Sequence, residues 1–173
     1  MVVTGKLCHI EHNNPVANHV SYAYKIRNLC GDESTMDIAI RKLLPVEWDH
    51  AYSLISQLRN ISKEKFIESV RIQTMNGYEL VGAFGDEKML GLMGFRPVHT
   101  LARGSHLHID DLVVDEASRS AGIGKKLLDF ATTESESRDM NFVFLDARQQ
   151  AIPFYERNGF AAHTSPSMKK PLR

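Results

Sequence analysis

The 173-residue chain is poor in several features that define whole classes of protein. It has two cysteines, Cys8 and Cys30, which argues against a disulfide framework. No apolar run approaches the roughly 20 residues of a membrane-spanning helix, and the first residues lack the charged start and apolar run of a signal peptide. The 21 basic and 21 acidic residues cancel, so we do not expect nucleic acid or a membrane as a partner. These absences predict a cytoplasmic globular protein of one domain size.

A short glycine-bearing turn is the most informative feature that is present. Residues 119–124 read Arg-Ser-Ala-Gly-Ile-Gly, after the apolar run 112–114 and before a helical pattern that starts near Lys125. Glycine lets the backbone approach a ligand closely, and the first N–H groups of a helix have no partner within the helix. A strand, a glycine turn and a helix start therefore predict a site for a phosphate-bearing ligand.

Two common phosphate-binding loops do not fit this turn. A Walker A loop needs Ser or Thr after Gly-Lys, but Lys126 follows Gly124-Lys125, and Arg119 stands where the first glycine belongs. A dinucleotide fingerprint needs a third Gly or Ala, and that position is Leu127. The sequence therefore indicates neither a P-loop nucleotidase nor a dinucleotide-binding domain.

A second motif, further along the chain, indicates which kind of phosphate-binding protein the glycine turn belongs to. Residues 154–160 read Phe-Tyr-Glu-Arg-Asn-Gly-Phe and follow an apolar strand pattern at 142–147. In this order and spacing, the two motifs resemble the GNAT superfamily of acyl-CoA-dependent N-acetyltransferases, whose phosphate loop has the form Gln/Arg-x-x-Gly-x-Gly/Ala. The resemblance implies an α/β (α+β) fold. Its central sheet is mixed, mostly antiparallel, flanked by helices and splayed at the acyl-CoA site. We assign residues 36–173 to this domain and residues 1–35 to an N-terminal extension of unknown role.

The hydrophobic periodicity predicts an order of elements that agrees with this fold. Strands are expected at 37–43, 78–84, 88–95, 106–115 and 142–147, with a last strand between Phe160 and Lys170. Helices are expected to begin at Pro45, at the N-cap Ser62, after the glycine turn as far as about 138, and around Phe154. Alternation at 20–26 suggests one more strand in the extension, and Met36 is an alternative start of the chain.

The resemblance implies that acetyl-CoA is the acyl donor and that the strand end and the turn bind it. Backbone groups freed by the splay would hold the pantetheine arm like an added strand, and an N–H near Val113 would polarise the thioester carbonyl. Arg119 either pairs with a phosphate or fixes the loop, and Lys125 is either a phosphate contact or a solvated helix start. The predicted cofactor-binding residues are Leu112, Val113, Val114, Arg119, Ser120, Ala121, Gly122, Ile123, Gly124 and Lys125.

Attack of an amine on a thioester needs a deprotonated amine and an acid for the departing thiolate. Tyr155 matches the tyrosine that often serves as the acid in the family, and an ordinary phenol pKa of about 10 keeps its proton at neutral pH. Asp111 is the predicted base or amine anchor, with Asp110, His108 and His106 as alternatives.

Strand geometry bears on the choice of base. Side chains alternate between the faces of a strand, so His106, His108 and Asp110 should share one face and Asp111 should take the other. A bulge would change that parity. The spacing His-x-His-x-Asp also fits a metal site, but a polar surface is the more common role of such residues and we expect no metal.

The acceptor is less defined. Many family members have Asn seven residues before the tyrosine, where this chain has Arg148, so Arg148 is a candidate to bind an acidic group on the acceptor. Arg96, His99 and Arg103 either bind such a group or belong to a solvated turn. A small-molecule amine is the first choice. A protein lysine, a peptide N-terminus, an aminoglycoside and an aminoacyl-tRNA are alternatives, as are a non-catalytic acyl-CoA sensor and an interaction module. A homodimer is left open.

Overall fold

The computed structural model describes residues 37–165 and 167–172. The N-terminal extension, the strand predicted at 20–26 and the proposed start at Met36 lie outside the described residues. All further statements concern the described part of the chain.

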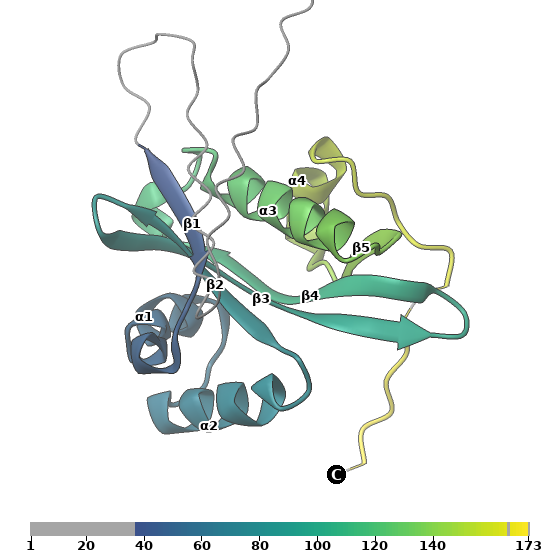
Figure 1. The fold of residues 1–173 in the computed structure, drawn as a ribbon, viewed down its shortest axis with the longest axis horizontal. Coiled ribbons are helices and arrows are strands. Elements are labelled where there is room, and N and C mark those ends of the chain that lie inside the picture. The colour runs from purple at the N-terminus through teal and green to yellow at the C-terminus, as the bar shows by residue number, and fades with distance from the viewer. Residues whose placement is uncertain (1–36, 166, 173) are drawn as a thin grey trace, which may run out of the picture.

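A five-stranded sheet forms the centre of the molecule, and its strands lie side by side in chain order (Figure 1). The first three pairings are antiparallel, and only the last one is parallel. The mixed, mostly antiparallel sheet is the fold that the sequence predicts. The strands are β1 (Ile38–Lys42), β2 (Glu79–Gly85), β3 (Lys88–Thr100), β4 (Gly104–Val114) and β5 (Phe142–Leu145).

Helices cover both faces of the sheet (Figure 1). α1 (Trp48–Leu58) follows a 3-10 turn that begins at Pro45, and α2 (Lys63–Thr74) is capped by Ser62, whose hydroxyl oxygen accepts from the Lys65 N–H at 3.3 Å. These two helices lie on one face. α3 (Ile123–Ser137) and the short α4 (Ile152–Arg157) lie on the other.

Each face has its own hydrophobic core. On the α3 side, Phe95, Leu107 and Leu127 are completely buried, and on the α1–α2 side Leu92 is completely buried and Val70 nearly so. Burying a side chain of this size contributes about 1.5–3 kcal/mol. The two cores hold the sheet between its helices, and their members include residues of β4 and residues packed from β5.

The β2–β3 hairpin forms as predicted, and strand β3 is longer than predicted. Its turn residues Asp86 and Glu87 both have positive φ angles, 47° and 67°, as in the tight turns that match the twist of a hairpin. β3 then continues past residue 95, and its pairing with β4 reaches from Gly91 to Thr100. Residues predicted as a loop before Gly104 are therefore partly strand.

The predicted last strand between Phe160 and Lys170 is wrong. No strand is found at 160–165 or 167–170. Pro166 lies in this stretch and Pro171 directly follows it, and proline has no N–H to give to a ladder. The tail contacts β5 through side chains instead, including a hydrogen bond from the Ser167 hydroxyl to Asp146 at 3.3 Å.

Candidate active site

A bulge in β4 determines which side chains reach the site. Phe95 pairs with Ile109 while the preceding Gly94 pairs with Asp111, so Asp110 is the extra residue. The extra residue reverses the alternation beyond it. Asp111 consequently reaches Arg59 and Tyr78 on the α1–α2 side. The prediction that Asp111 points to the opposite face from Asp110 is wrong, because it assumed a regular strand.

β4 and β5 separate beyond the bulge. Their parallel pairing runs from His106–Phe142 to Ile109–Leu145 and stops there, whereas residues 111–114 remain paired with β3 on their other edge. The β4 edge that faces away from β3 is therefore not paired with a strand in the described chain over those residues. Such an edge offers N–H and C=O groups to an extended, amide-rich ligand.

The glycine turn leads directly from this edge into α3. Ser120 and Gly122 have φ angles of 70° and 76°, and Gly122 is the N-cap residue of the helix. Its carbonyl accepts from the Lys126 N–H at 3.1 Å, which is the first hydrogen bond of the helix. The N–H groups just before Lys126 have no partner within the helix and are available to an anion. A Cβ on Gly124 would lie 3.0 Å from Phe154 Cζ. The turn is thus packed against α4 with no spare room at Gly124.

The charged side chains of the turn have partners in their own segment. Arg119 lies 3.4 Å from Glu116, and Lys125 lies 2.7 Å from Asp129. Both pairs are exposed and weakly held. The contacts of Arg119 and Lys125 with a phosphate stay predictions, and the backbone of the turn is the part whose geometry suits an anion.

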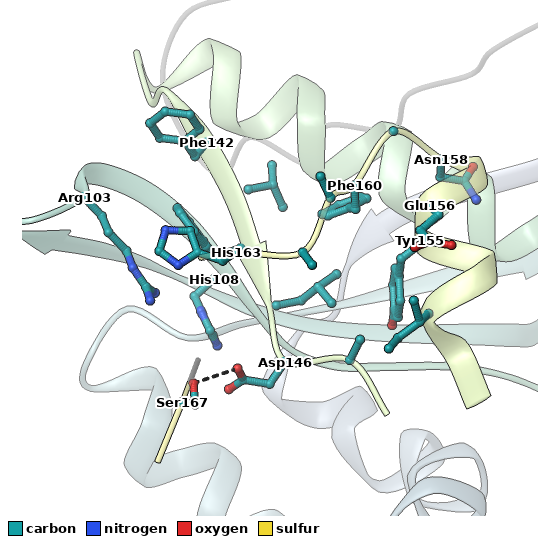
Figure 2. Close-up of a pocket in the computed structure, with 18 of the residues that line it drawn as sticks. Arg103, His108, Phe142, Asp146, Tyr155, Glu156, Asn158, Phe160, His163 and Ser167 are labelled. Carbon is teal, nitrogen blue, oxygen red and sulfur yellow. Dashed lines mark hydrogen bonds between the residues drawn. The ribbon is translucent and has the colours of Figure 1, made fainter. Parts of the chain in front are cut away.

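Tyr155 projects from α4 into a cavity of about 1060 Å³ (Figure 2). Its ring contacts those of Phe154 and Phe160, with centroids 5.1 and 5.7 Å away. Burial raises the pKa of the phenol above its ordinary value. The hydroxyl makes no hydrogen bond to a described residue, so its proton is available.

The same cavity is lined by a group of cationic and imidazole side chains (Figure 2). Phe144 of β5 is central to this group. The Arg103 guanidinium lies 4.6 Å above its ring, and the His163 ring meets it edge-on at 5.5 Å. His108 lies near Asp146 in the view. The cavity therefore has the Tyr155 phenol on one side and Arg103, two histidines and Asp146 on the other.

The two aspartates of the bulge are held by arginines. Arg59 donates to Asp111 at 2.8 Å, and Arg96 donates to Asp110 at 2.8 Å. The Tyr78 hydroxyl also donates to Asp111, at 3.3 Å. Burial raises the pKa of Tyr78 well above its ordinary value, and the nearby Asp111 charge adds to this. The Asp111 carboxylate is thus fixed from two sides.

Sequence analysis missed the role of Arg59. It lies 52 residues from Asp111 in the chain, and no local pattern marks a partner at that separation. Arg148, which was singled out, donates to the Leu58 carbonyl at 2.6 Å. Arg59 and Arg148 are therefore both anchored at the C-terminal end of α1.

A β4 edge without a strand partner, a glycine turn at the start of α3 and the partly buried Tyr155 phenol suit an acyltransferase that takes its acyl group from a coenzyme A thioester. A family model described as an acetyltransferase (GNAT) domain matches residues 54–173. The chain therefore belongs to the GNAT family and is an acetyl-CoA-dependent N-acetyltransferase.

Individual relatives agree with this membership. An uncharacterized N-acetyltransferase, YhdJ, of Bacillus subtilis is 31% identical over 120 residues, which are 66% of this chain and 84% of that protein. A glucosamine 6-phosphate N-acetyltransferase of Trypanosoma brucei brucei is 45% identical over 56 residues, 32% of this chain and 38% of that protein. The crystal structure of a Trypanosoma brucei acetyltransferase superposes with a TM-score of 0.67 at 26% identity, covering 79% of this chain and 100% of that one.

No helix in the described part of the chain is long and apolar enough to cross a membrane. Within residues 37–165 and 167–172, no three His, Cys, Asp or Glu side chains are placed together to hold a metal ion.

Proposed function

We propose that the acceptor is a small-molecule amine that carries an anionic group, with an amino-sugar phosphate as the first candidate. The observation that carries this proposal is a pair of guanidinium groups, on Arg103 and Arg148, that have no carboxylate partner among the described residues. Arg103 lines the cavity, and Arg148 directly follows the cavity-lining Ala147. A guanidinium presents a planar set of donors that matches phosphate and carboxylate oxygens.

The comparison with known proteins supports the same class of acceptor. The relative from Trypanosoma brucei brucei is named for glucosamine 6-phosphate, an amine that bears a phosphate. A cavity of about 1060 Å³ is also at the upper end of the range for small-molecule sites. A protein lysine or N-terminus is the alternative, and it would have to reach the same cavity in extended form.

Within this reaction we assign Tyr155 as the general acid for the departing thiolate, since its buried phenol keeps its proton. Asp111 binds the acceptor amine and holds it in place, and its ion pair with Arg59 favours this role over that of a base. The backbone of residues 112–114 and 120–124 binds the pantetheine arm and the pyrophosphate. The side chains of Arg119 and Lys125 add charge at the turn.

The acceptor is tested by release of the CoA thiol from acetyl-CoA in the presence of a panel of amines. The panel contains glucosamine 6-phosphate, glucosamine, free amino acids, an aminoglycoside and a lysine-containing peptide. We expect the largest kcat/KM for glucosamine 6-phosphate and a higher KM for glucosamine, which lacks the phosphate. Equal kcat/KM and KM for the two sugars would show that no anion site contributes to acceptor binding. A higher kcat/KM for the peptide would overturn the proposal of a small-molecule acceptor.

Arg148→Gln and Arg103→Gln locate the anion site within that assay. Loss of a phosphate contact should raise KM for glucosamine 6-phosphate and leave KM for glucosamine unchanged.

Cytoplasmic location and a homodimer also stay proposals. Fluorescence microscopy of the tagged chain and light scattering of the pure protein test them.

A further inference from the structure

His108 occupies the point at which β4 and β5 begin to separate. It pairs with Phe144, one residue before the last pair of the two strands. Its side chain is about 16% exposed and lines the cavity that also contains Tyr155. A thioester held along the free edge of β4 would therefore lie close to this imidazole.

The other candidate bases are engaged or out of reach. Asp111 is bound by Arg59 and Tyr78, and Asp110 receives two hydrogen bonds from Arg96. His106 is almost fully buried beside Phe144, with Nδ1 3.1 Å from the Gly104 carbonyl.

His108 differs from all of these. Its ring makes no hydrogen bond to a described residue, and Nε2 lies 3.8 Å from Asp110 Oδ1, beyond hydrogen-bond distance. Asp110 is therefore an ion-pair neighbour of Nε2 once the ring is protonated, and the neutral ring is held by packing. Of the two histidines, His108 is the one that lines the cavity and has no hydrogen bond to a described residue.

We propose that His108 is the general base that takes the proton from the acceptor amine. The assignment concerns the proton path of the acetyl transfer and does not depend on which amine is the acceptor.

The charges around His108 suit this task. Burial lowers the pKa of His108 below its ordinary value, so the ring is neutral and able to accept a proton at neutral pH. Asp110 and Asp146 act in the opposite direction and stabilise the imidazolium once it forms, whereas Arg96 and His106 oppose it. Arg103 and His163 line the same cavity.

The proton balance is as follows. His108 takes one proton from the acceptor ammonium and later releases it to solvent. The free amine forms the C–N bond to the thioester carbon, and the C–S bond breaks. Tyr155 gives its proton to the thiolate sulfur, and the second proton lost from nitrogen restores the Tyr155 hydroxyl through water. The products are an acetamide, CoA and one proton in solution.

The first test is His108→Gln, measured with the best amine of the panel over a range of pH, with His50→Gln on the exposed surface of α1 as the control. We expect kcat to fall about 100-fold with little change in acetyl-CoA affinity. In the wild type, kcat/KM should rise with pH through a pKa below the ordinary histidine value. In the variant, the rise should move to the pKa of the amine, and amines of lower pKa should lose less activity. The assignment would be overturned if kcat/KM of the variant rose with pH through the same pKa as in the wild type. A kcat of the variant within two-fold of the wild-type value would overturn it as well.

The second test needs no acceptor. The histidine ring signals of the wild type are followed by NMR through a pH titration, and the signal missing in His108→Gln is that of His108. We expect a pKa below the ordinary value in the free protein and a chemical-shift change when acetyl-CoA binds. If acetyl-CoA binds and the His108 signals stay in place, the imidazole lies away from the thioester and the proposal fails, whatever the amine panel gives.

Discussion

At Tyr155, partial burial determines both the direction of the ring and the pKa of the phenol. The ring lies between Phe154 and Phe160, which fixes its direction. The same burial raises its pKa above the ordinary value, so the phenol stays protonated at neutral pH. An acid with these properties can protonate sulfur without lowering the fraction of reactive amine.

Replacing Tyr155 by Phe removes the hydroxyl and keeps the ring contacts. We expect kcat to fall by about 10²-fold or more, the usual contribution of a general acid, with acetyl-CoA affinity nearly unchanged. Steady-state kinetics and calorimetric titration measure the two quantities. Tyr52→Phe is the control, because the Tyr52 hydroxyl donates to the Ile61 carbonyl, at 3.0 Å, between α1 and α2. If the two variants have equal turnover, Tyr155 is not the acid.

Tyr78 makes stability depend on alkaline pH. Its pKa is raised well above the ordinary value by burial and by Asp111, so the folded chain holds a proton that the unfolded chain loses above about pH 10. The stabilisation is complete below that pH and falls as pH rises toward the folded pKa, by about 1.4 kcal/mol per pH unit.

Urea unfolding between pH 9 and 11 tests this dependence against Tyr78→Phe. The free energy of unfolding should fall less steeply with pH in the variant, which lacks the ionising group. The variant should also be less stable at pH 8, because Asp111 loses one of its two partners. Parallel pH curves for the two proteins would show that Tyr78 does not titrate differently on unfolding.

At the scale of elements, the start of α3 is the part on which cofactor binding depends. Gly124→Asp places a carboxylate beside the predicted pyrophosphate and a Cβ 3.0 Å from Phe154. Gly124→Asn has the same shape without the charge and separates the two effects. We expect calorimetry to find acetyl-CoA affinity reduced in the Asn variant and absent in the Asp variant. Equal losses in both would mean that packing against Phe154, and not repulsion of phosphate, sets the cost.

The elements were predictable from sequence to different degrees. The Ser62 cap and the helix after the glycine turn were predicted because their signals are local, within one turn of chain. The β4 bulge was not, since it depends on how Gly94 and Asp111 align across two strands. The error about the Asp111 face follows from that alone. The predicted last strand failed for another reason, because Pro166 lies within it and has no N–H to give to a ladder.

The candidate site divides in the same way. The glycine turn and Tyr155 are carried by contiguous motifs, so sequence was sufficient to propose them. The contact of Arg59 with Asp111 and the place of His108 in the cavity beside Tyr155 depend on segments far apart in the chain. His108 was one of three alternatives until its neighbours Asp110, Asp111 and His106 were seen to have partners of their own.

For the whole molecule, the open question is whether residues 1–35 belong to the catalytic domain. The described sheet begins at Ile38, and β1 already pairs along its length with β2. Residues 38–160 supply the helices on both faces of the sheet and the members of both cores. A chain that starts at Met36 therefore keeps these described contacts around β4 and α3.

We expect the chain that starts at Met36 to be soluble and to bind acetyl-CoA with the affinity of the full chain, as measured by calorimetry. Its thermal unfolding midpoint should lie close to that of the full chain, because the described residues supply both hydrophobic cores. The amine panel then separates two roles for the extension. Unchanged kcat/KM would make it dispensable, and a raised KM for the amine with intact CoA binding would make it an arm over the acceptor site. An insoluble truncation, or one that no longer binds acetyl-CoA, would show that the domain boundary at residue 36 is wrong.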